Sequence, residues 1–105
     1  TTIQSPAVTL PSGGTLKLNF SWYLAHGSNA SSADYLRVKV VGSTTTQVFQ
    51  QLGAATNRNG AWAASSIDIS SYAGQSVRIL IEAADASGAS LVEAGVDNVK
   101  ITQQP

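Results

Sequence analysis

The sequence predicts an all-β protein, an antiparallel β-sandwich of jelly-roll type. Apolar and polar residues alternate with a period of two along several segments, which is typical of half-buried strands. Clusters of Gly, Ser, Asn and Asp separate these segments at intervals that suit short antiparallel strands. Because helical periodicity is scarce, we expect residues 1–105 to form one sandwich domain.

The N-terminal part of the chain contains an edge strand and one long strand. The segment Pro6–Leu10 is expected at a sheet edge, where the missing N–H of a leading proline does no harm. Apolar residues then occupy every second position from Leu16 to Leu24. This alternation predicts a long strand with Phe20 and Trp22 in the core.

The remaining strands follow the same pattern, and turn clusters separate them. The Ala-rich segment 83–94 is interpreted as a loop between strands, because it contains Gly88 and is flanked by β-branched runs. Trp62 follows the Asn57–Gly60 turn and opens a short run. We expect it to pack over the edge of the sandwich, and the alternative is a platform for a ligand at the rim. The predicted strands are 35–40, 45–52, 67–69, 77–84 and 91–102, the last one bent near Gly95.

The composition excludes several classes of partner. The net charge is zero and only 11% of residues are charged, so no basic patch is present for nucleic acid or anionic lipid. No apolar run reaches the roughly 18 residues of a membrane span. Without cysteine the chain has no disulfide and no zinc–thiolate site. The neutral surface, rich in Ser, Thr, Ala and Gly, favours a secreted, extracellular bacterial protein, which we expect to be a monomer.

Catalysis is not expected. His26 is the one histidine, and neither a G-x-S-x-G elbow nor a phosphate-binding loop is present. Glu82 and Glu93 are the candidates for a pair of acids that would cleave a glycoside. We favour the interpretation that both are solvated or ion-paired sheet residues, so the chain is predicted not to be an enzyme.

A structural calcium ion is a further hypothesis. Calcium binds six to eight oxygen atoms and tolerates irregular loops. The candidate oxygen donors are Asp34, Asp97 and Asn98, with contributions from the loops around Ser31 and Asp85. The alternative is that Asp34 caps a turn and Asp97 accepts hydrogen bonds from backbone N–H groups.

The polar faces of the strands suggest a saccharide-binding surface. Tyr23 and Tyr35 alternate with core positions, as do the cations Arg37 and Lys39. If the two strands share a sheet, one face presents two tyrosines and two cations, which suits a polar and acidic saccharide. The alternative is ordinary packing of these side chains across strands. The candidate ligand-binding residues are Tyr23, His26, Tyr35, Arg37, Lys39, Arg78, Glu82 and Glu93.

Four segments resemble bacterial jelly-roll accessory domains. The segment Ile67–Ile79 resembles a hairpin of these domains, in which the motif S-x-Y-A-G-Q-x-V-x-I joins two strands. Val96–Ile101 resembles their last strand, which has the motif I-D-D-V-x-I. Phe20–His26 and Ser31–Val38 are similar to the early strands of modules appended to secreted hydrolases. The parents of such modules include zinc carboxypeptidases and xanthan-degrading lyases and glycanases.

The resemblance implies a non-catalytic module that binds polysaccharide and carries calcium near its last strand. Asp97 matches the first acid of the family's Asp-Asp pair, Asn98 replaces the second, and Asp34 matches the acid that opens a long strand. We therefore expect a carbohydrate-binding module that anchors a hydrolase or lyase, the catalytic domain of the same chain, to its substrate. The alternative is a purely structural accessory domain of a secreted peptidase.

Overall fold

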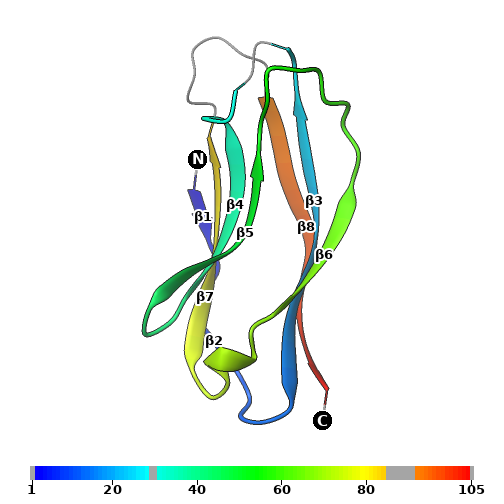
Figure 1. Ribbon diagram of the computed structural model, residues 1–105. Helices are drawn as coiled ribbons and strands as arrows, with labels where there is room; N and C mark the ends of the chain where they lie inside the picture. Colours follow the sequence, from blue (N-terminus) through cyan, green and yellow to red (C-terminus); the bar gives the residue numbers. More distant parts are fainter. Residues whose placement is uncertain (1, 29–30, 85–91, 105) are drawn as a thin grey trace.

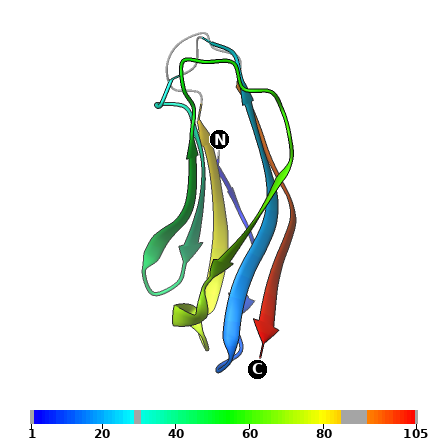
Figure 2. The same ribbon diagram turned by 45° about the vertical axis from the view of Figure 1, so that its right-hand side comes forward.

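Two antiparallel sheets face each other in the computed structural model, which confirms the predicted β-sandwich (Figure 1). The structure describes residues 2–28, 31–84 and 92–104, and of residues 92 and 93 only the backbone. Figure 2 shows the two layers separated along most of their length. The alternation of buried and exposed residues along β3 explains this architecture, because each sheet has one apolar face to cover.

The first sheet is built from five strands of the described chain. Its order is β1-β7-β4-β5, and β2 pairs with β7 on the same side as β1. The strands are β1 (Thr2–Gln4), β2 (Val8–Thr9), β4 (Tyr35–Val41), β5 (Thr45–Leu52) and β7 (Ser76–Ala84).

The second sheet has the order β6-β3-β8. The long strand β3 (Thr15–His26) lies between β6 (Ala63–Asp68) and β8 (Val92–Gln104). A 3₁₀ helix, η1 (Ser70–Tyr72), leads from β6 to β7 in the other sheet. Among the described strands, β4 and β5 form a hairpin within one sheet, whereas every connection from β5 onward crosses to the facing sheet, as in a jelly roll.

The core lies between the inward faces of the two sheets. Phe20, on β3, packs edge-on against Phe49 of β5, with ring centroids 5.2 Å apart. Trp22 packs against the same ring at 5.3 Å, so Phe49 joins the sheets. The predicted burial of Phe20 and Trp22 is confirmed. The buried apolar residues are Leu10, Leu16, Leu18, Phe20, Trp22, Leu24, Leu36, Val38, Val40, Ile69, Tyr72, Val77 and Ile79.

The N-terminal edge is one interrupted strand. β1 and β2 pair with opposite ends of β7, and Pro6 lies between them. Ser5 bridges the interruption: its N–H donates to the Ile79 carbonyl, and its hydroxyl accepts the Ile79 N–H, each at 2.9 Å. The edge strand predicted for Pro6–Leu10 is confirmed as Val8–Thr9, and β1 continues the same edge.

The irregularity in β8 lies at Asn98 rather than at the predicted position, Gly95. Asn98 has a φ of 54°, and the pairing of β3 with β8 shifts register between Asn19 and Ser21. Asn tolerates this left-handed conformation better than most residues. The extra residue lets both Val96 and Val99 face the other sheet, although strict alternation would place them on opposite faces.

The segments 67–79 and 83–94 were expected to form a hairpin and a loop. The segment 67–79 is a crossover between sheets rather than a hairpin, because β6 pairs with β3 and β7 pairs with β4. Its Tyr72 is 6% exposed and donates a hydrogen bond to the Thr46 hydroxyl, so η1 contributes a core residue that alternation did not indicate. The loop predicted for 83–94 has its central part, 85–91, outside the described residues.

Candidate functional site

An exposed tryptophan and a half-buried tyrosine lie in contact on the outer face of the second sheet. Trp62 directly precedes β6 and is 57% exposed, although the sequence indicated a position packed over the sandwich edge. Its indole lies against the ring of Tyr23 on β3, with centroids 5.5 Å apart and planes tilted by 49°. We call this pair, Tyr23 and Trp62, the aromatic platform.

Two glycines make room for the aromatic platform. Gly95 pairs with Tyr23 across β3 and β8, and the tip of the Trp62 indole lies 3.4 Å from the position that a Cβ at Gly95 would occupy. A Cβ at Gly60 would overlap the hydroxyl end of Tyr23. Gly60 is therefore the position at which an added side chain would displace Tyr23, whereas a methyl group at Gly95 would make an ordinary contact with the indole.

The outer face of the first sheet carries a different set of side chains. The guanidinium carbon of Arg37 lies 3.7 Å from the ring centroid of Tyr35, and Arg37 Nε donates to Gln50 Oε1 at 2.7 Å. Lys39 Nζ lies 2.6 Å from Glu82 Oε1, and both side chains are about three-quarters buried. We call this surface the Arg37 face. It consists of Tyr35, Arg37, Lys39, Gln47, Gln50 and Glu82.

The two tyrosines do not share a surface. Tyr23 is on β3 in one sheet and Tyr35 is on β4 in the other, and both point away from the core. The condition for a single face with two tyrosines and two cations is therefore not met. Arg78 pairs with Val41 and is exposed at the end of the Arg37 face, where its guanidinium donates to the Ser5 carbonyl at 3.2 Å.

His26 belongs to the interior at one end of the sandwich rather than to either outer face. It is 7% exposed, and its backbone forms a two-way bridge with Arg58. Arg58 Nε donates to the Leu24 carbonyl at 2.8 Å, and its guanidinium lies over Trp22. These contacts explain the position of His26 by packing, and they leave its ring little surface for a ligand.

The three candidate calcium ligands do not fit one ion. Asp34 is fully buried just before β4, where its carboxylate accepts the Ser31 N–H at 2.8 Å. Asp97 and Asn98 are exposed in the other sheet, and the Asn98 N–H donates to Asp97 Oδ1 at 2.8 Å. Among the described residues, no three His, Cys, Asp or Glu side chains gather as a metal site would require.

The two acids proposed for glycoside cleavage belong to different sheets. Glu82, on β7, points outward from the first sheet and pairs with Lys39. The backbone of Glu93, on β8, pairs with Ala25 in the second sheet, and its side chain lies outside the described part of the structure. Glycoside cleavage by these two acids would require them to lie on neighbouring strands, and the topology does not place them so.

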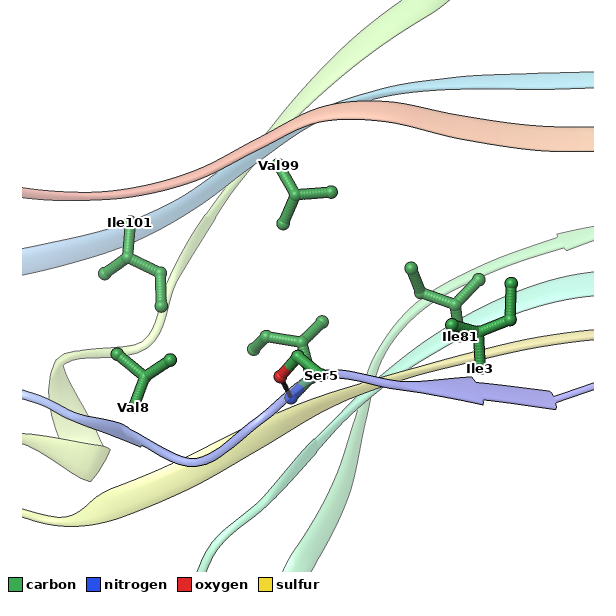
Figure 3. Close-up of a pocket in the computed structure, with 7 residues that line it drawn as sticks. Ile3, Ser5, Val8, Ile81, Val99 and Ile101 are labelled. Atoms are coloured by element: carbon green, nitrogen blue, oxygen red, sulfur yellow. Dashed lines mark hydrogen bonds between the residues drawn. The ribbon is translucent and has the colours of Figure 1, made fainter.

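An apolar groove opens between the sheets along one edge of the sandwich. Val99 and Ile101 point from β8 toward Val8, Ile3 and Ile81 on the facing sheet (Figure 3). The groove has a volume of about 490 Å³. Ile3 is 64% exposed and Val99 is 44% exposed, so this edge leaves apolar side chains in contact with water. We call it the edge groove.

Comparison of the chain with protein-family models and with curated proteins finds no match. Within the described residues, no helix has the length and apolar character that crossing a membrane would need.

Sequence reasoning missed part of both outer surfaces. The position of Trp62 beside a turn marked it as a residue near the edge of the sandwich. A single sequence does not show whether such a tryptophan packs inward or stays exposed. Gln50 and Gln47 lie in a strand with weak alternation, and nothing in that pattern shows that they border Arg37. Their position depends on the pairing of β4 with β5, where Arg37 is opposite Gln50.

Proposed function

We propose that the chain is a non-catalytic carbohydrate-binding module that anchors a secreted bacterial hydrolase or lyase to a polysaccharide. The observation that carries this proposal is the aromatic platform, in which Trp62 is 57% exposed and lies against Tyr23. A pyranose ring presents apolar C–H groups on its faces and hydroxyl groups at its rim. An exposed indole beside a tyrosine offers a matching apolar surface, with polar groups at its edges.

The surroundings of the platform favour binding over incidental exposure. Tyr23 and Trp62 pack against each other and lie close to the backbone at Gly60 and Gly95, which supports a surface that is formed before a ligand binds. A pre-ordered surface loses less side-chain entropy on binding than a mobile one. The outward side chains of the neighbouring strands near Trp62 are small or polar, such as Ala64 and Asp97, and they leave the indole accessible.

The benefit of such a module to a hydrolase is proximity. Binding to the polymer converts the encounter between catalytic domain and substrate into an intramolecular event, with a higher effective concentration. This role requires no reacting group in the module itself.

Affinity gel electrophoresis against neutral polysaccharides tests the proposal. We expect the wild-type chain to be retarded by at least one polymer and Trp62→Ala to migrate as it does in a gel without polymer. Ile3→Ala is the matched control, because Ile3 is also an exposed apolar residue, 64% exposed, but lies at the edge groove. The proposal is wrong if no polymer retards the wild type, or if Trp62→Ala and Ile3→Ala are retarded equally.

The edge groove favours a second candidate function, a structural domain that packs against a catalytic domain in the same chain. Exposed apolar surface of this kind marks contact sites more often than free surface. The catalytic domain would then cover the groove residues Ile3, Val8 and Val99. This function would not require the domain to bind a saccharide.

Amide hydrogen exchange along β8 tests the second candidate function. β8 lies at the edge of its sheet, so part of its backbone N–H groups face no partner strand in the described structure. Slower exchange at residues 96–101 in the complete parent protein than in the isolated domain would support packing at this edge. Equal exchange rates would exclude it.

A further inference from the structure

The Arg37 face contains a cation with two contacts that favour one orientation. The guanidinium carbon lies over the Tyr35 ring, 3.7 Å from its centroid, and Arg37 Nε donates to Gln50 Oε1 at 2.7 Å. Gln47 Nε2 lies 3.4 Å from the same Gln50 oxygen and supports its position. Among the described residues, no acceptor binds the terminal nitrogens of Arg37, so both can bind another acceptor in the paired geometry that matches a carboxylate.

No carboxylate of the described residues forms an ion pair with Arg37, although Glu82 is its register partner on β7. The described ion pair on this face joins Lys39 to Glu82 and leaves Arg37 without an acidic partner. With Arg78, the described residues on the outer face of the first sheet include three cations and one carboxylate, an excess of two positive charges.

On the opposite surface of the sandwich, the outward charges of the described side chains cancel. Its described outward charges are two lysines, Lys17 and Lys100, and two aspartates, Asp68 and Asp97. The chain as a whole has no net charge, so the positive excess is a local property of the first sheet. Such a local excess attracts and orients anionic ligands.

The polar groups around Arg37 form a row across three strands. Arg37 on β4 has Gln50 of β5 as its register partner on one side and Glu82 of β7 on the other. An amide, a guanidinium and a carboxylate therefore follow one another across the sheet. Sugar hydroxyl groups both donate and accept hydrogen bonds, and they can pair with the amide and the carboxylate while Arg37 binds an acidic substituent.

We infer that the Arg37 face is a second saccharide site, separate from the aromatic platform and selective for carboxylate-bearing sugars. This inference rests on the proposed function, since it concerns a domain that binds polysaccharide. The two sites lie on opposite sides of the sandwich, so each can be removed without touching the other. Arg37 binds the sugar carboxylate through its terminal nitrogens, and Gln47 and Gln50 contact hydroxyl groups beside it.

The test uses polygalacturonate, alginate, xanthan and hyaluronan in affinity gels, each compared with its methyl-esterified or carboxyl-reduced form. We expect retardation by at least one acidic polymer and not by its uncharged form. Arg37→Gln, which keeps a planar group over Tyr35, should weaken that binding about tenfold or more, as expected for a charge-assisted hydrogen-bonded pair. Lys100→Ala is the control, because it removes one positive charge from the other sheet and should bind like the wild type.

The outcomes separate this inference from the proposed function. If neutral polymers retard the chain through Trp62 and none of the four acidic polymers is preferred over its uncharged form, the Arg37 inference is wrong and the proposed function stands. If an acidic polymer binds and Arg37→Gln matches Lys100→Ala, the inference is also wrong. If Arg37→Gln loses acidic binding and keeps the Trp62-dependent retardation by a neutral polymer, two separate sites are present.

Discussion

Phe20 of one sheet packs edge-on against Phe49 of the other, with ring centroids 5.2 Å apart and planes at 88°. This contact and the neighbouring one between Trp22 and Phe49 join two layers that share no backbone ladder. The stability of the sandwich therefore depends on side chains at its centre, whereas the outer faces are free to vary with function.

Phe20→Ala should lower the free energy of unfolding by about 3–5 kcal/mol, because it leaves a cavity beside the ring of Phe49. Urea denaturation measures the change. Trp62→Ala serves as the comparison, since its side chain is mostly exposed and its removal should change stability by about 0.5 kcal/mol or less. Similar losses in the two variants would contradict the assignment of Trp62 to the surface.

Gly60→Ala should disturb the aromatic platform from a position outside it. The added methyl group overlaps the Tyr23 hydroxyl, so the ring must move, at a cost of about 1–3 kcal/mol. We expect a lower melting temperature together with reduced retardation in polysaccharide gels. In the double variant Gly60→Ala, Tyr23→Ala the stability should partly return while the retardation stays low. Additive losses of stability would show that the two positions are not in contact.

Asn98→Val should destabilise the chain by about 1–2 kcal/mol, because a β-branched residue is strained at a positive φ. Asn98→Gly should be tolerated, since glycine adopts this conformation freely. Chemical denaturation of the two variants distinguishes the backbone requirement from a need for the Asn98 amide. If the glycine variant lost as much stability as the valine variant, the amide would be the important group.

We expect Asp68 to make stability depend on pH. The Ser70 hydroxyl and then the Ser70 N–H, which donates to Asp68 Oδ1 at 2.8 Å, hold the pKa of Asp68 below its ordinary value of 3.8. A carboxyl whose pKa is lower in the folded state than in the unfolded state stabilises the folded state. The stabilisation is complete when the pH is above the unfolded-state pKa, and it is lost as the pH falls through the folded-state pKa.

The comparison of wild type with Asp68→Asn checks this pH dependence. The wild type should melt at a higher temperature from about pH 7 down to about pH 4, and the difference should disappear at lower pH. Thermal scans followed by circular dichroism give both curves. A difference that grew on acidification would have the opposite sign and would contradict the role of the Asp68 carboxylate.

Alternation along single strands was enough to predict the fold class, most strands and the burial of Phe20 and Trp22, because a strand in a sandwich has one apolar face whatever it pairs with. It also placed Tyr23, Tyr35 and Arg37 on outward faces correctly. It did not indicate Tyr72, whose burial follows from the turn of η1 against the Thr46 hydroxyl.

Within the regular strands, the sequence by itself therefore determined which side chains point outward and which point inward, since that property is local and has a period of two. It did not determine this for Trp62, for Tyr72 or for the residues around the bulge at Asn98. Only the tertiary structure decided which outward residues are neighbours. Pairing β3 with β6 brought Trp62 to Tyr23, and pairing β4 with β5 brought Gln50 to Arg37. The same assembly put the two tyrosines on opposite sides of the molecule, because partner choice among strands depends on contacts between residues far apart in the chain.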